Sequence, residues 1–235
     1  MRVEQVGPGR VAVFGHFGRP LLAFPAEAGS AFEWRDRGMV DAIGGLLEAG
    51  RVKLFCVDAW DAGTWSDRSV PTDERARRHE AFEAWLHDDV VPFIGRDCGT
   101  EEVAVAGVSM GAFHAVTLAL RRADRFPLAI GLSGNYAPHD WHGWGDVPYF
   151  HSPLAFVPGL EGDHLEWLRS RLSVLLVVGQ GMWEDTTGSL DSTRALAGAL
   201  QAKGLRCELD VWGHDVPHDW PSWRAQIAHH LPRFC

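Results

Sequence analysis

The pentapeptide Gly-Val-Ser-Met-Gly at residues 107–111 is the feature that most restricts how this chain can fold. A short apolar run, 103–106, precedes it, and a segment with helical character, 112–120, follows it. A G-x-S-x-G pattern between a strand and a helix is typical of a nucleophile elbow, whose small residues let the two backbones approach closely. Such a turn lifts the Ser109 hydroxyl clear of the backbone and aims the N–H of Met110 at the place where an oxyanion would form. Ser109 is therefore the candidate nucleophile.

The rest of the chain alternates strand-like and helical segments. Strand-like runs, several of them continuously apolar, lie at 11–14, 21–24, 52–57, 103–106, 128–132, 174–178 and 207–212. Helical patterns lie at about 36–49, 72–94, 192–203 and 222–231 and after Ser109. Continuous apolar runs are typical of parallel strands covered on both faces. We therefore expect one α/β domain over residues 1–235, with a mostly parallel sheet and helices on both faces. Residues 134–165 interrupt the alternation, and we expect them to form an excursion near the site, without a large separate lid.

Composition limits the classes of partner. The formal net charge is −9, and the chain has no long basic run, which argues against nucleic acid or an anionic membrane as the main partner. No segment has the length of a membrane span, and the first residues lack the apolar core of a signal peptide, so we expect a cytoplasmic protein. The four cysteines form no C-x-x-C pair and the twelve histidines are scattered, so neither a disulfide framework, a metal site nor a cofactor is expected.

A serine hydroxyl needs a base to take its proton and an acid to orient that base. On the fold that carries this motif, the acid follows the serine in sequence and the histidine comes last. The run 174–178 leads into a loop that contains Glu184 and Asp185. Both are placed to serve, but neighbours in sequence cannot both face one imidazole. Glu184, three residues after Gly181, is the preferred acid, and Asp185 is the alternative.

The base is expected in the loop after the last strand. The run 207–212 leads into a loop with two histidines, His214 and His218, before the terminal helix at 222–231. His214 follows a glycine directly after the strand, whereas His218 stands at the entrance to the helix. His218 is the preferred base, and His214 is the alternative.

A second oxyanion donor is expected in the loop after an early strand. The strand at 21–24 is followed by residues 25–30, which read Pro-Ala-Glu-Ala-Gly-Ser. Pro25 has no N–H to donate. The backbone N–H of Ala26 or of Glu27 would serve, and Ala26 is our choice.

Three segments resemble the esterase D type of esterase family, which includes S-formylglutathione hydrolases, enterochelin esterases and mycolyltransferases. The elbow continues into Ala112-Phe-His-Ala; the loop 179–184 is rich in glycine and ends in an acid; and His218-Asp-Trp-Pro-Ser-Trp223 is similar to an H-x-W-x-x-W ending. The last is the most specific, and it supports His218 over His214. The resemblance extends from about residue 20 onward. The chain departs from it at Phe24-Pro25, where many members carry an Asp-Gly turn.

The resemblance implies an α/β-hydrolase fold, a catalytic triad of serine, acid and histidine, an oxyanion hole that includes the N–H after the serine, and no metal. Residues and resemblance together predict hydrolysis of a small-molecule carboxylic ester through an acyl-serine intermediate. The alternatives are acyl transfer or thioester hydrolysis on the same triad, and a non-catalytic binding module. The segment 134–165, rich in Trp, Tyr and Pro, predicts a small to medium, partly aromatic pocket. The oligomeric state, including a homo-oligomer, is left open.

Overall fold

A single mixed sheet organises the molecule. The structure is a computed structural model that describes residues 1–138, 144–146 and 149–235. Its eight strands lie in the order β1-β2-β4-β3-β5-β6-β7-β8. They are β1 Arg2–Val6, β2 Gly9–Phe14, β3 Arg19–Phe24, β4 Val52–Val57, β5 Ala104–Val108, β6 Leu128–Leu132, β7 Ser173–Val178 and β8 Arg206–Val211. The strands β1 and β2 are antiparallel to their neighbours, and the other strands pair in parallel, which confirms the predicted mostly parallel sheet.

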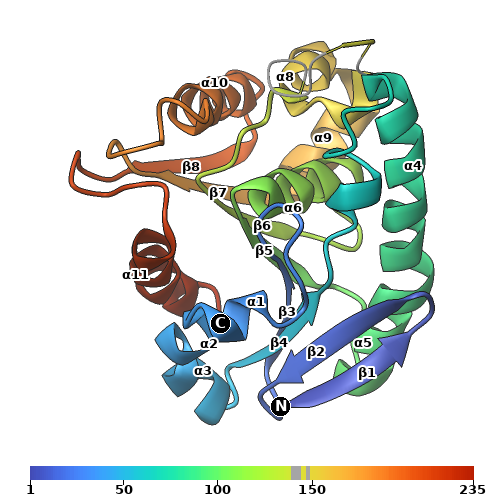
Figure 1. Ribbon diagram of the computed structural model, residues 1–235, viewed down its shortest axis with the longest axis vertical. Helices are drawn as coiled ribbons and strands as arrows, with labels where there is room; N and C mark the ends of the chain where they lie inside the picture. The colour runs from blue at the N-terminus through green and yellow to red at the C-terminus, as the bar shows by residue number, and fades with distance from the viewer. Residues whose placement is uncertain (139–143, 147–148) are drawn as a thin grey trace.

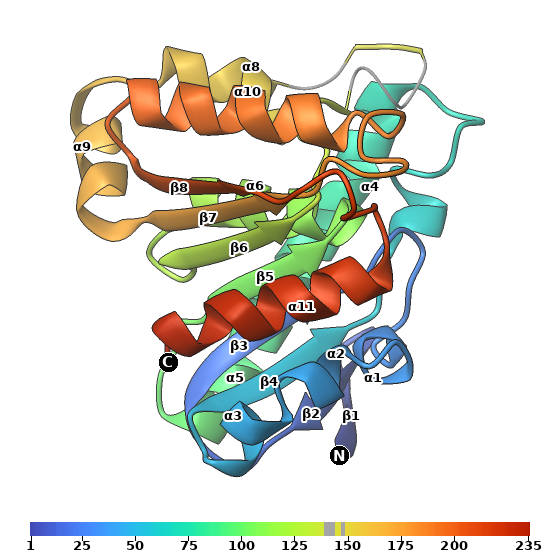
Figure 2. The same cartoon turned by 90° about the vertical axis from the view of Figure 1, so that its left-hand side faces the viewer.

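Helices cover both faces of the sheet, as the apolar runs predict (Figures 1 and 2). Along β3, Leu22 and Phe24 pack into one buried cluster and Leu21 and Ala23 into the other, because successive side chains of a strand point to opposite faces. The first cluster is covered by α4 Thr72–Trp85, α5 Val91–Cys98, α6 Met110–Arg121, α8 Pro153–Phe156, α9 Gly162–Arg171 and α10 Ser189–Ala202. The second is covered by α1 Glu33–Asp36, α2 Met39–Ala42, α3 Gly44–Glu48 and α11 Trp220–His230.

Three segments differ from the expected elements. The helix expected at 36–49 is divided among three short helices, α1, α2 and α3. Gly38 separates α1 from α2, because its φ of +76° is a left-handed conformation that a right-handed helix cannot continue. The helix expected at 72–94 continues through a π-helical turn, Leu86–Val90, into α5 and ends at Cys98. The edge strand β1 was not expected, because its residues are mostly exposed and its sequence lacks an apolar run.

The excursion at 134–165 is described in part. Residues 139–143, which include Trp141, and residues 147–148 lie outside the described residues. In the described part, Phe156 and Val157 are buried in the first cluster, so this stretch packs onto the body of the protein. Among the described residues, no helix has the length and apolar character that crossing a membrane requires.

The sheet brings distant loops to one edge. The carboxyl ends of parallel strands lie at the same edge, and Figure 2 shows the loops that follow β7 and β8 side by side there. Within the described part of the chain, the non-glycine residues with positive φ are Ala28, Ser109, Ser133 and Trp183, at +52° to +72°. They lie in the loops after β3, β5, β6 and β7. Such backbone strain concentrates at functional sites, which points to this edge.

Candidate active site

The elbow predicted around Ser109 is present between β5 and α6. Ser109 has φ +53° and ψ −119°, and its N–H donates to the carbonyl oxygen of Leu132 at 2.9 Å. A Cβ on Gly107 would lie 2.0 Å from the carbonyl oxygen of Gly111, and a Cβ on Gly111 would lie 2.2 Å from that of Pro25. Neither position has room for a side chain. The glycines therefore permit the close approach of strand, helix and the loop after β3 that holds Ser109 in its strained conformation.

Three predicted residues meet in a hydrogen-bonded line. His218 Nε2 lies 3.1 Å from Ser109 Oγ, and His218 Nδ1 lies 3.1 Å from Glu184 Oε2. Glu184 is fully buried, and the His218 side chain is 11% exposed. A proton on Nδ1 would donate to the carboxylate, and Nε2 would then accept the serine proton; this tautomer is inferred from the partners. The arrangement can activate a hydroxyl as a nucleophile.

Among the described residues, neither alternative has a hydrogen bond to Ser109, His218 or Glu184. Asp185 is exposed, and its Oδ1 accepts the N–H of the next residue, Thr186, at 2.8 Å. His214 is exposed in the turn after β8. Glu184 and His218, the preferred members of each pair, are the ones that the fold brings to the serine.

Ser133 and Trp223 support the acid and were not anticipated as a pair. Glu184 Oε1 accepts the Ser133 hydroxyl proton at 2.6 Å and the N–H of Gly179 at 3.2 Å. Trp223 Nε1 donates to Ser133 Oγ at 3.0 Å, and its ring stands edge-on to the His218 imidazole, with centroids 5.0 Å apart. The tryptophan was visible in the H-x-W-x-x-W block. One feature of the sequence could have identified Ser133: it directly follows a predicted strand, β6, whose carboxyl end lies at the edge of the sheet that carries Ser109.

The loop after β3 holds its amide groups differently from the prediction. The N–H of Ala26, predicted as the second oxyanion donor, donates to Glu33 Oε2 at 2.9 Å, so it is not available to an oxyanion in this structure. The N–H of Ala28 donates to Asp61 Oδ2 at 3.2 Å. Between them, the N–H of Glu27 has no hydrogen-bond partner in the described part of the chain. Burial raises the pKa of the Glu33 carboxyl, although the bond from Ala26 favours its charged form.

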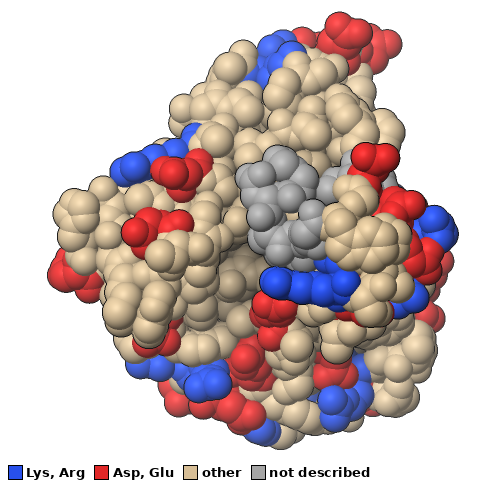
Figure 3. All heavy atoms as spheres, turned by 45° about the horizontal axis from the view of Figure 1, so that its top comes forward, with Lys and Arg blue, Asp and Glu red and all other residues tan. Residues whose placement is uncertain are grey.

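The serine opens onto a small cavity of about 240 Å³. It is lined by Glu27, Arg68, Ser109, Met110, Asn135, Thr186, Thr187 and Ser189. Polar side chains dominate this lining, and it includes no aromatic residue among those described, unlike the partly aromatic pocket that the sequence predicted. Of the segment 134–165, Asn135 contributes to it. Figure 3 shows the molecular surface hollowed beside the grey atoms, with basic and acidic side chains along the border of the hollow.

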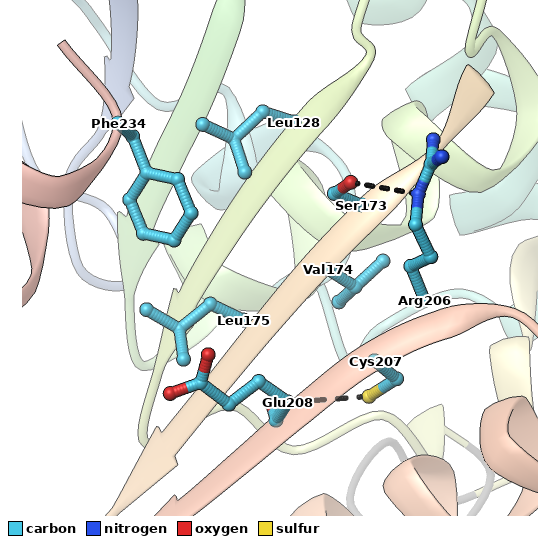
Figure 4. Close-up of a pocket in the computed structure, with 8 residues that line it drawn as sticks. All are labelled: Leu128, Ser173, Val174, Leu175, Arg206, Cys207, Glu208 and Phe234. Carbon is cyan, nitrogen blue, oxygen red and sulfur yellow. Dashed lines mark hydrogen bonds between the residues drawn. The ribbon is translucent and has the colours of Figure 1, made fainter.

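A second cavity, of about 330 Å³, lies at the opposite edge of the sheet (Figure 4). Its lining includes Leu128, Ser173 and Arg206, the first residues of β6, β7 and β8. The thiol in its wall, Cys207, is a poor nucleophile at neutral pH, because burial raises its pKa to about 12. This cavity has no part in the chemistry at Ser109. No group of three or more His, Cys, Asp or Glu side chains within the described residues is arranged to hold a metal ion.

Solved structures with the same fold carry related names. A ferulic acid esterase is 18% identical with a TM-score of 0.75, over 99% of this chain and 95% of that one. MPT51 of Mycobacterium tuberculosis is 14% identical with a TM-score of 0.71, over 99% and 97%. An S-formylglutathione hydrolase of Agrobacterium tumefaciens is 15% identical with a TM-score of 0.62, over 99% and 98%. At these identities the likeness establishes the α/β-hydrolase fold.

The sequence itself identifies the family. No curated protein matches the chain. The profile of the family described as "Putative esterase" matches residues 22–234, nearly the whole chain. The chain therefore belongs to this esterase family, the one its motifs resemble, and it is a carboxylic ester hydrolase with the α/β-hydrolase fold.

Proposed function

We propose that the protein is a serine esterase in which Ser109, His218 and Glu184 form the catalytic triad. The observation that supports this most strongly is the continuous line of hydrogen bonds from Glu184 through His218 to Ser109 Oγ, with both links at 3.1 Å. A buried carboxylate that contacts Nδ1 fixes the tautomer in which Nε2 accepts a proton.

The reaction follows from this geometry. Ser109 Oγ attacks the ester carbonyl carbon while its proton passes to His218 Nε2, and the carbonyl oxygen takes the negative charge. Collapse of this tetrahedral intermediate expels the alcohol, which receives the proton from His218. Water then attacks the acyl-serine, with His218 again as base, and releases the carboxylic acid and free Ser109. Glu184 stabilises the imidazolium that forms in each half of the reaction.

We assign the oxyanion hole to the backbone N–H groups of Met110 and Glu27. Met110 begins α6 directly after the serine, where a helix N-terminus favours negative charge. Glu27 lines the same cavity and has a free N–H among the described residues, whereas Ala26 donates to Glu33. Removing one donor of such a pair typically lowers kcat by about 10²–10³.

The cavity favours a small, polar ester. A volume of about 240 Å³ is below the usual range for drug-sized ligands, and apart from Met110 the described residues of its wall carry hydroxyl, amide and charged groups. We expect short acyl groups to be preferred over long ones. Acyl transfer or thioester hydrolysis would use the same acyl-serine and is the alternative within this proposal. The single domain and the cytoplasmic location stay predictions from the sequence.

A panel of p-nitrophenyl esters of increasing chain length tests this function. The expected result is turnover that declines with acyl length and is abolished in Ser109→Ala, with the far-UV and near-UV circular dichroism of the variant unchanged. Product analysis with a competing alcohol separates hydrolysis from acyl transfer. Absence of turnover by the wild type on every ester, together with no covalent labelling, would favour a non-catalytic binding module.

A further inference from the structure

A buried carboxylate and a buried imidazole form a pair that the proton transfers do not use. Asp61 is 1% exposed and His114 is 4% exposed. His114 Nε2 lies 2.8 Å from Asp61 Oδ1, and the other carboxylate oxygen, Oδ2, accepts the N–H of Ala28 at 3.2 Å. A buried pair of this kind often stabilises a fold no more than apolar residues of the same volume, although removing one partner is costly, so its presence here calls for a further explanation.

The surroundings of His114 fix its orientation. The His79 ring stacks on it at 4.9 Å between centroids, and the rings of Phe24 and Phe82 lie within 6.2 Å. His114 Nδ1 is buried and has no hydrogen-bond partner among the described residues. Since a bare lone pair is less costly to bury than an unpaired N–H, this assigns the ring proton to Nε2, which then donates to Asp61.

This pair joins the two segments that carry the oxyanion donors. His114 lies about one turn into α6, the helix that begins with Met110. Ala28 directly follows Glu27 and is held at φ +55°. Asp61 therefore connects the helix of the first donor to the loop of the second.

Two hydrogen bonds hold the loop after β3, one at each of the backbone amides that flank Glu27. Asp61 accepts the N–H of Ala28, and Glu33 accepts the N–H of Ala26, one on each side of Glu27. Fixing both flanking amides leaves the peptide between them little freedom to rotate. In addition, the carbonyl oxygens of Phe24 and Pro25 lie directly against Gly111 of α6, where even a Cβ would not fit.

We propose that Asp61 and His114 are positioning residues of the oxyanion hole: together they hold the N–H groups of Glu27 and Met110 at the separation that one carbonyl oxygen requires. This inference rests on the proposed function. Neither side chain touches the substrate. Each acts by placing a backbone donor, and donors stabilise a transition state only when they converge on the oxygen as its charge develops.

The test combines kinetics with an inhibitor that forms an oxyanion. Asp61→Asn and His114→Phe are compared with the wild type for kcat, KM and the inhibition constant of a short alkyl trifluoromethyl ketone, whose hemiketal oxygen occupies the oxyanion hole. We expect kcat to fall about 10- to 100-fold, as expected for a displaced rather than a lost donor. KM should change less than twofold, and the inhibition constant should rise by the same factor as kcat/KM falls.

Two further variants separate positioning from a structural role. His114→Gln keeps an N–H donor near the position of Nε2, so it should recover most of the activity that His114→Phe loses. Asp210→Asn changes another carboxylate–imidazole pair, in which His230 Nε2 lies 2.9 Å from Asp210 Oδ2 and the Asp210 side chain is partly exposed, and it should leave kcat and the inhibition constant unchanged. Urea unfolding of each variant shows how much stability it has lost.

The outcomes distinguish this inference from the proposed function. If the wild type is inhibited by the ketone through Ser109 but Asp61→Asn retains wild-type kcat and inhibition, the positioning role is overturned and the esterase proposal stands. An equal loss in Asp210→Asn, or equal kinetics in His114→Gln and His114→Phe, also overturns it. A wild type that the ketone does not inhibit and whose turnover survives Ser109→Ala overturns the proposed function itself.

Discussion

At the scale of single residues, the account depends on which carboxylate contacts His218. Glu184→Gln replaces the charged acceptor with an amide that allows the wrong imidazole tautomer, and we expect kcat to fall by about 10³–10⁴. Asp185→Asn changes an exposed neighbour and should stay within about twofold of the wild type. Steady-state kinetics of the two variants, measured side by side, check this. The reverse ranking would transfer the role to Asp185.

A second prediction at the scale of single residues concerns Ser133, which the sequence analysis did not identify. Ser133→Ala removes the donor to Glu184 Oε1 and leaves the Trp223 N–H buried without an acceptor. We expect kcat to fall about 10-fold or more, and the free energy of unfolding to fall by about 1–3 kcal/mol. The double variant Ser133→Ala/Trp223→Phe removes the unpaired N–H, so it should recover stability without recovering kcat. If kcat recovered with stability, Ser133 would have only a structural role.

At the scale of helices and loops, the junction of β5, α6 and the loop after β3 has no spare volume. Gly111→Ala would place a Cβ 2.2 Å from the carbonyl oxygen of Pro25, so loop and helix must separate. We expect lower stability and loss of most activity, measured by urea unfolding and ester turnover. The matched control is Gly198→Ala in the exposed face of α10, where nothing lies within 4 Å of the new Cβ. It should stabilise the protein by about 0.5–1 kcal/mol and leave activity unchanged.

The elements that sequence reasoning found are those whose signal is local. Six of the seven expected strands carry a run of buried residues, and the seventh, at 207–212, is a strand-like run whose residues are partly exposed. The triad residues were found because each follows such a strand. The edge strand β1 and the division of 36–49 into three helices were missed, because pairing at a sheet edge and a left-handed Gly38 depend on what the rest of the chain packs against them.

The parts of the site that were missed depend on contacts between distant segments. Glu33 and Ala26 lie close in sequence, yet nothing in the sequence shows that a carboxylate captures that amide. The contacts of Asp61 with His114 and of Ser133 with Trp223 span 53 and 90 residues. A pattern of residue types gives no information on which polar groups meet across such separations, so the support of the acid and of the oxyanion loop had to come from the structure.

At the scale of the whole molecule, buried histidines make stability depend on pH. Burial lowers the pKa of His79 well below its usual value and that of His151 to about 4. The unfolded chain takes up these protons near pH 6.5, whereas the folded protein does not. Above about pH 6.5 both rings are neutral in the folded and the unfolded chain, and the free energy of unfolding has its full value. As pH falls from 6.5 toward 4, the free energy of unfolding decreases by up to about 1.4 kcal/mol per pH unit for each histidine.

Urea unfolding between pH 4.5 and 7.5 measures this dependence. The free energy of unfolding of the wild type should decline below about pH 6.5. In His151→Gln the decline of the free energy of unfolding with falling pH should be smaller by up to about 1.4 kcal/mol per pH unit, because one histidine with a lowered pKa has been removed. His214→Gln, which removes an exposed histidine, is the matched control and should keep the wild-type slope. An unchanged slope in His151→Gln would show that this ring takes up its proton equally in both states.

Covalent labelling with a fluorophosphonate tests the central claim most directly, since the reagent reacts with a serine only where a base activates it and an oxyanion hole receives the phosphonyl oxygen. The account predicts one adduct per chain, on the peptide that contains Ser109, seen by intact mass and peptide mapping. It predicts no adduct in Ser109→Ala, a strongly reduced rate in His218→Ala and a wild-type rate in His214→Ala. Undiminished labelling of Ser109→Ala, or an adduct on another residue of the wild type, would contradict the assignment of Ser109 as the nucleophile.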